Sequence, residues 1–206
     1  MADVMAPRVR LVLMAVASMV LLAALAIVLF VRPNDGAADQ QGFAGAIRPP
    51  IPPQAWTLTD QDGRAVRVGA PSSGPSVVTF LYTHCQDTCP VTASTIRGAL
   101  DQLGHHVPVY AVSVDPANDT PQSARVFMSQ NHVTGRMHFL LSPDATLQHV
   151  WTQFGIRPQE RDSEHTAYVV LLDRTGRQRI GFPFDKLTPE GLAHDLRRLE
   201  QSGTPT

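Results

Sequence analysis

The chain has 206 residues, of which 43% are apolar and 17% charged, and it contains two cysteines. This composition excludes a disordered protein and suits one globular domain with an accessory segment. Residues 33–206 carry 14 basic and 17 acidic side chains, so their formal net charge of −3 gives no indication of nucleic-acid binding.

An apolar stretch near the N-terminus predicts a transmembrane anchor. Leu11 to Val31 spans 21 residues, with Ser18 as its one clearly polar member. As a helix it would reach about 30 Å, the thickness of the hydrocarbon part of a bilayer. A cleaved signal peptide is the alternative, because residues 44–46 (AGA) resemble a cleavage site. The apolar segment is longer than that of a signal peptide, which favours an uncleaved anchor.

The charges that flank this segment predict its orientation. Arg8 and Arg10 precede it and Arg32 follows it, so the short arm of residues 1–10 stays in the cytoplasm and residues 33–206 are exported. The arm is too short for an organelle transit peptide, which favours a bacterial inner (cytoplasmic) membrane protein that faces the periplasm. Residues 32–53 are rich in Pro, Gly and Ala and predict a flexible linker. The folded domain is then 54–201, with 202–206 as a tail.

From residue 56 the chain alternates strand and helix patterns. The predicted strands are two short ones within 56–66 around the Asp62-Gly63 turn, then 77–82, 107–114, 138–141, 167–172 and 178–182. The predicted helices are 91–103, 121 to about 131, 144–154, and a last one opened by Thr188-Pro189-Glu190. This order is that of an α/β, thioredoxin-like fold with a strand-helix piece inserted near 137–155.

The two cysteines occur in THCQDTCP, separated by three residues, after a buried strand and before a helix. Pro90 in the first turn predicts that Cys89 caps the helix and that Cys85 lies on the loop before it. Free N–H groups at a helix start favour thiolates, so we expect lowered pKa values for both thiols. Two such sulfurs can form a reversible disulfide or a soft metal site, which selects Cu(I) or Zn.

A third ligand would complete a copper site, whereas structural zinc requires four. The strand at 167–172 should run antiparallel to the strand before the cysteines, so the residues just before Ala167 return beside the cysteine loop. The residue there is His165. His84 should point away from Cys85, and His138 is interpreted as a core residue. The other histidines are expected at solvated or capping positions.

Three ordered motifs, FLYTHCQDTCP, VSVDPANDTP and EHTAYVVLLDRTG, resemble those of the Sco/SenC family of membrane-anchored, thioredoxin-like copper proteins. The resemblance covers roughly residues 54–200. It implies copper, as Cu(I) and transiently Cu(II), bound by Cys85, Cys89 and His165. It also implies delivery to, or maturation of, the dinuclear copper centre of cytochrome c oxidase, with a subunit of that oxidase as partner. Gln86 departs from the proline found in many members.

Four functions remain open from the sequence. The first is a noncatalytic copper chaperone, or metallochaperone. The second is a thiol-disulfide reductase in which Cys85 and Cys89 keep the metal-site cysteines of a redox partner reduced. The third, a structural disulfide, is disfavoured because it would close a very short loop. The fourth function is that of a peroxidase. It is disfavoured because Thr83 stands two residues before Cys85, whereas the threonine of the peroxiredoxin motif stands three residues before its cysteine. Asp115 and Asp119 are interpreted as turn and helix-cap residues without a metal role.

Overall fold

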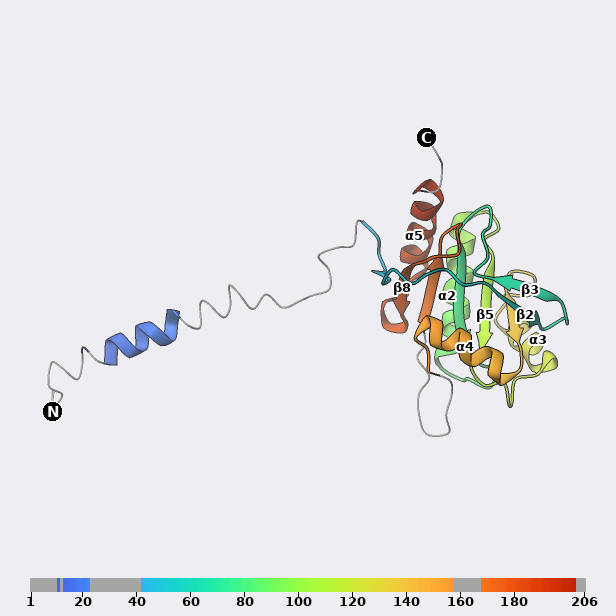
Figure 1. Ribbon diagram of the computed structural model, residues 1–206, viewed down its shortest axis with the longest axis horizontal. Helices are drawn as coiled ribbons and strands as arrows, with labels where there is room; N and C mark the ends of the chain where they lie inside the picture. Colours follow the sequence, from blue (N-terminus) through green and yellow to red (C-terminus); the bar gives the residue numbers. More distant parts are fainter. Residues whose placement is uncertain (1–10, 12, 23–41, 158–167, 203–206) are drawn as a thin grey trace. The chain divides into compact units, whose positions relative to one another are not determined.

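The computed structural model describes residues 11, 13–22, 42–157 and 168–202 (Figure 1). The chain divides into two compact units, Met1–Asp39 and Gln40–Thr206. In the first unit, residues 11 and 13–22 are helical. No helix within the described part of the chain is both long and apolar enough to cross a membrane. Residues 12 and 23–31 of the predicted anchor lie outside the described residues, so the anchor stays a prediction.

The second unit is built on an eight-stranded mixed sheet whose strands follow the order β1-β8-β7-β4-β5-β6-β2-β3. The strands are β1 (Ala46–Ile47), β2 (Trp56–Asp60), β3 (Ala65–Val68), β4 (Ser76–Leu81), β5 (Val109–Ser113), β6 (His138–Leu141), β7 (Tyr168–Leu172) and β8 (Gln178–Pro183). β4, β5 and β6 are parallel to one another, whereas β7 is antiparallel to β4. All six residues of β4 are buried, as its continuous apolar run predicts.

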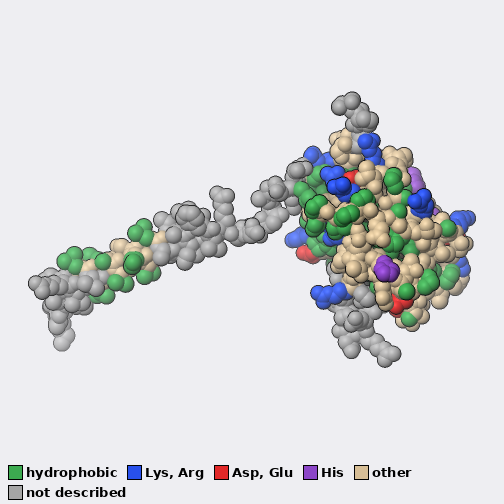
Figure 2. Space-filling view, viewed as in Figure 1, with side chains coloured by type: hydrophobic (Ala, Val, Ile, Leu, Met, Phe, Trp, Pro, Cys, Tyr) green, Lys and Arg blue, Asp and Glu red, His purple; other side chains and the backbone are tan. Residues whose placement is uncertain are grey.

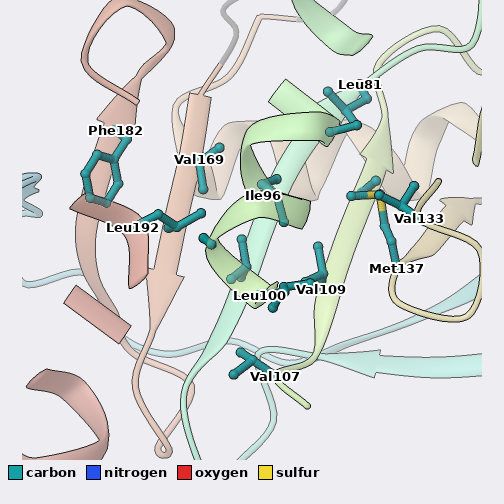
Figure 3. Packing of buried hydrophobic residues seen from close by; sticks show 14 of the residues in the cluster. Leu81, Ile96, Leu100, Val107, Val109, Val133, Met137, Val169, Phe182 and Leu192 are labelled. Atoms are coloured by element: carbon teal, nitrogen blue, oxygen red, sulfur yellow. The ribbon is translucent and has the colours of Figure 1, made fainter. Parts of the chain in front are cut away.

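Helices cover both faces of the sheet. They are α2 (Thr88–Leu103), α3 (Pro121–Gln130), α4 (Asp144–Phe154) and α5 (Pro189–Ser202), with a short 3₁₀ helix η1 (Phe184–Lys186) after β8. One core joins α2, α3 and α5 to the sheet, and Figure 3 shows Leu100 of α2 beside Val109 of β5. A second core lies under α4, where Phe154 packs against Phe80 with ring centroids 5.3 Å apart.

The predicted α/β, thioredoxin-like arrangement is confirmed, including the inserted β6-α4 piece. The predicted bounds of β6 and α4 agree with the structure, and α3 ends one residue before the predicted end. Gly104 and Gly155 terminate α2 and α4 in the left-handed conformation that glycine tolerates best. α2 differs at its start, because it begins at Thr88 and not at Val91.

Residues 42–48, predicted to belong to a flexible linker, instead pack on the domain. β1 pairs with β8 in an antiparallel manner. The N–H groups of Ala44 and Gly45 donate to the carboxylate of Asp195 at 2.8 and 2.9 Å, and Arg48 donates to Gln178 at 2.8 Å. We call residues 42–48 the N-terminal strap. The linker prediction is wrong for this segment because long-range pairing offsets its poor local propensity.

Charged side chains are interspersed on the face shown in Figure 2 and do not gather in one patch of a single sign. Lys and Arg side chains occur at several places across the second unit, with histidine and acidic side chains among them. This face therefore gives no electrostatic indication of a particular partner.

Candidate metal centre

The loop between β4 and α2 carries both cysteines. It leaves the sheet after Leu81 and joins α2 at Thr88, at the carboxyl ends of the parallel strands. Cys85 lies on this loop and Cys89 lies in the first turn of α2. The residue that caps the helix is Asp87, so the predicted capping role of Cys89 is wrong. Pro90 is tolerated in the first turn because an N–H group at that position has no partner within the helix.

The two sulfur-bearing residues are in direct contact. The N–H of Cys89 donates to Sγ of Cys85 at 3.2 Å, and Oγ1 of Thr88 lies 3.6 Å from the same sulfur. Both cysteines are free thiols, and their residues are 7% and 0% exposed, respectively. The site is therefore a reduced dithiol at a helix start, nearly closed to solvent.

The pKa values of the two thiols move in opposite directions. Burial alone would raise the pKa of Cys85, but hydrogen bonds from Cys89, the backbone of Asp87 and Thr88 lower it below its ordinary value. Burial raises the pKa of Cys89, and the neighbouring Cys85 raises it further. The prediction of lowered pKa values is therefore confirmed for Cys85 and wrong for Cys89, because burial outweighs the helix start there. Cys85 is the thiol that ionises first.

Tyr82 adds a phenol to the surroundings of the sulfurs. Burial raises the pKa of Tyr82 to about 12, and the charge and hydrogen bonding of Cys85 act in the same direction. The phenol therefore stays protonated at neutral pH and can donate to a thiolate. The sequence motif contains this residue, but its role depends on the fold and was not predicted.

His165, the predicted third ligand, lies outside the described residues. The structure does describe the strand that follows it. β7 is antiparallel to β4, with Val169 opposite Thr79, and Oγ1 of Thr79 donates to the carbonyl of Tyr168 at 3.3 Å. The topology on which the prediction depends is therefore confirmed, whereas the ligand itself stays a prediction. Among residues 42–157 and 168–202, no group of three or more His, Cys, Asp or Glu side chains could hold a metal ion.

Histidines elsewhere have other partners. His138 is half-buried, its Nδ1 lies 3.1 Å from the buried carboxylate of Asp60, and its ring stacks on Tyr110. The predicted core position is therefore only partly correct, because the side chain of His138 remains 42% exposed. His84 is exposed, with Nδ1 3.2 Å from Oγ1 of Thr83. The structure therefore gives neither histidine a place in a donor set with the cysteines.

Asp119 has a larger role than the predicted turn or cap. The residue that caps α3 is Thr120, while the carboxylate of Asp119 is turned inward. It accepts hydrogen bonds from the N–H and hydroxyl of Thr83 at 2.8 and 2.7 Å and from the hydroxyl of Ser113 at 2.5 Å. Sequence spacing could not reveal this contact, because Thr83 and Asp119 are 36 residues apart.

The model of the SCO1/SenC protein family matches residues 48–201 of this chain. Among curated proteins, the chain is 38% identical over 69 residues to protein SenC of Rhodobacter capsulatus, a stretch covering 32% of this chain and 31% of that protein. It is 23% identical over 141 residues to an SCO2-like protein of Rickettsia prowazekii, covering 63% of this chain and 68% of the relative. The match to protein SenC thus spans about a third of that protein's length.

Solved structures share the fold. ScoI of Bradyrhizobium japonicum, solved with copper bound, has a TM-score of 0.61 and 32% identity, covering 71% of this chain and 98% of that one. Apo Sco1 of Thermus thermophilus has a TM-score of 0.64 and 23% identity, covering 79% of this chain and 99% of that one. The similarity to ScoI extends to both sequence and fold, whereas the similarity to apo Sco1 is one of fold alone.

Proposed function

Because this chain belongs to the SCO1/SenC family, we propose that it is a copper chaperone. Cys85, Cys89 and His165 hold one copper ion, as Cu(I) or transiently as Cu(II). The cargo is delivered to, or used to mature, the dinuclear copper centre of cytochrome c oxidase, whose copper-receiving subunit is the partner. Residues 11–31 anchor the protein in the inner membrane, and the domain faces the periplasm.

The observation that carries this proposal is the contact between the two reduced thiols. Cys85 and Cys89 are adjacent, buried and free, and Cys85 ionises readily because it accepts hydrogen bonds from the helix start. Two thiolates are soft ligands that favour Cu(I), which accepts two or three donors. Copper binding also displaces the proton that the buried thiol of Cys89 otherwise keeps. Support comes from the copper-bound relative in Bradyrhizobium japonicum.

Anaerobic titration of the reduced full chain with Cu(I) tests the proposal. We expect one copper per chain, lost in Cys85→Ser and Cys89→Ser and weakened in His165→Ala. The matched control is His106→Ala, since His106 is an exposed histidine after α2. Equal Cu(I) affinity in wild type and His165→Ala would show that His165 is not the third ligand. Copper binding that persists in both cysteine variants would overturn the site.

A second candidate function is thiol-disulfide reduction, favoured by the unequal exposure of the two thiols. The Cys85 thiolate attacks a partner disulfide and releases one partner thiolate. Cys89 then attacks Sγ of Cys85, releasing the second partner thiolate and leaving a disulfide in this chain. Two electrons pass to the partner in this exchange. If wild type and His165→Ala reduce a model disulfide equally and neither retains copper, reduction is the main function.

A further inference from the structure

The carboxylate of Asp119 joins three elements at the cysteine end of the sheet. Oδ1 accepts both hydrogen bonds from Thr83, which follows β4, and Oδ2 accepts from Ser113, the last residue of β5. Asp119 itself lies just before α3. Oγ1 of Thr83 also lies 3.0 Å from Oγ of Ser123, in the first turn of α3. The exits of both strands are thereby fixed to one acidic group.

This carboxylate is well suited to rigid positioning. Asp119 is 8% exposed, so its oxygens have little access to water, and its hydrogen bonds are formed within the protein. A hydrogen bond to a charged group is stronger than one between neutral groups. Removing the acceptor would leave the N–H of Thr83 and the hydroxyl of Ser113 without this partner, which is costly. The arrangement therefore resists displacement of Thr83.

Thr83 stands two residues before Cys85, so its position limits where the sulfur can lie. Within the loop, the N–H of Cys85 donates to the carbonyl of Tyr82 over a long 3.4 Å. The other restraint on the loop is at its far end, where Cys89 and Thr88 of α2 contact Sγ. Asp119 thus fixes the near end of the loop and α2 fixes the far end.

We propose that Asp119 is a positioning residue for copper, which holds the Cys85 loop in the geometry that brings Sγ of Cys85 to Cys89. The inference deepens the proposed function and rests on it. Asp119 does not touch the metal. It acts through Thr83, in the way that partners outside a ligand set commonly orient the ligands, and loss of such a partner reduces metal affinity about 10- to 100-fold.

The test compares Asp119→Asn with Asp173→Asn in the full chain. Asp173 is a matched control because its carboxylate also accepts bonds from a threonine N–H and hydroxyl, at 2.9 and 2.6 Å, and from Arg179 at 3.2 Å. It lies in the turn between β7 and β8, at the end of the sheet away from the cysteines. Cu(I) affinity is measured by competition with a chromophoric chelator. Amide hydrogen exchange of residues 83–88 is measured separately in metal-free protein.

We expect Asp119→Asn to lower Cu(I) affinity about 10-fold or more and to speed exchange at residues 83–88 relative to the core. Asp173→Asn should keep affinity within about twofold of wild type, since distant sites act independently. Wild-type affinity and exchange in Asp119→Asn would overturn the inference. The inference would also be overturned if affinity fell in proportion to overall stability, and to the same degree, in Asp119→Asn and Asp173→Asn.

Two further variants make the outcome independent of folding problems in Asp119→Asn. Thr83→Val removes the hydroxyl donor and keeps the N–H, so it should weaken Cu(I) binding less than Asp119→Asn does. Thr83→Ser keeps a hydroxyl at this position, so its Cu(I) affinity should equal that of wild type. Equal affinity in Thr83→Val and wild type would contradict the role of this contact. If wild type binds no Cu(I), the proposed function fails, while exchange at residues 83–88 still decides whether Asp119 holds the loop.

Discussion

The backbone N–H of Cys89 donates to Sγ of Cys85 at 3.2 Å. This contact makes the first turn of α2 part of the dithiol site, because a backbone donor stabilises one thiolate while the other thiol stays buried. The three residues between the cysteines permit this geometry by placing Cys85 before the helix and Cys89 within it.

Unequal reactivity of the thiols follows from this contact. In reduced, metal-free protein, iodoacetamide should modify Cys85 before Cys89, because the pKa of Cys85 is lowered while burial raises that of Cys89. The rate at Cys85 should rise with pH at values below the ordinary titration of a free thiol. Mass spectrometry of peptides quenched at successive times measures both rates. Faster modification of Cys89 would contradict the assignment.

The pair formed by Asp60 and His138 predicts a loss of stability in acid. Burial acts to raise the pKa of Asp60, but hydrogen bonds from the backbone of Arg64 and from His138 lower it below its ordinary 3.8. A lowered pKa contributes stability that is present above about 3.9 and is lost as pH falls through the folded-state value. Urea unfolding at pH 5 and pH 3 should show this decline. The decline should be smaller in Asp60→Asn, and an equal decline would contradict the prediction.

Removing the N-terminal strap should destabilise the domain. A chain that begins at Gln54 loses the two N–H groups that bond to Asp195, whose residue is 0% exposed. Losing these two donors, while Nδ1 of His194 remains 2.8 Å from the carboxylate, costs about 1–3 kcal/mol, to which the lost strand pairing adds. Urea unfolding should therefore place residues 54–206 at least about 2 kcal/mol below residues 40–206. Equal stabilities would show that the strap contributes nothing.

A single methyl group should test the same strap in the full chain. A Cβ atom added at Gly45 would lie 2.5 Å from Ile180 and 2.8 Å from Phe182. Overpacking of this kind costs about 1–3 kcal/mol, so Gly45→Ala should lower the free energy of unfolding by that amount. Gly74→Ala is the control, because a Cβ atom there meets nothing within 4 Å. Equal effects of the two substitutions would contradict tight packing of the strap.

Patterns that repeat over several residues predicted most of the fold. The continuous apolar run of β4 predicted a central, buried strand, and the turn at Asp62-Gly63 predicted the β2-β3 hairpin. Glycines predicted the ends of α2 and α4. β1 was missed because it has two residues and lies within a segment rich in Pro, Gly and Ala. Its stability comes from β8 and Asp195, which are more than 130 residues away.

The candidate site was predictable in its residue types but not in its electrostatics. The sequence pattern predicted that Cys85 and Cys89 lie at a helix start, and the predicted order of strands indicated His165 as the third ligand. The raised pKa of Cys89 depends on burial by distant elements, and the contact between Asp119 and Thr83 depends on two strand exits meeting. Neither property is encoded in a local pattern, because both arise from the packing of the whole sheet.

The N-terminal strap also determines how the domain responds to mechanical load. Tension applied to the chain before Gly42 reaches the folded unit through β1, which pairs with β8 over two residues. The bonds to Asp195 and the pairing with β8 carry that load before β4 or α2 does. We therefore expect the strap to yield first under tension, while the loop that holds Cys85, three strands further into the sheet, keeps its geometry.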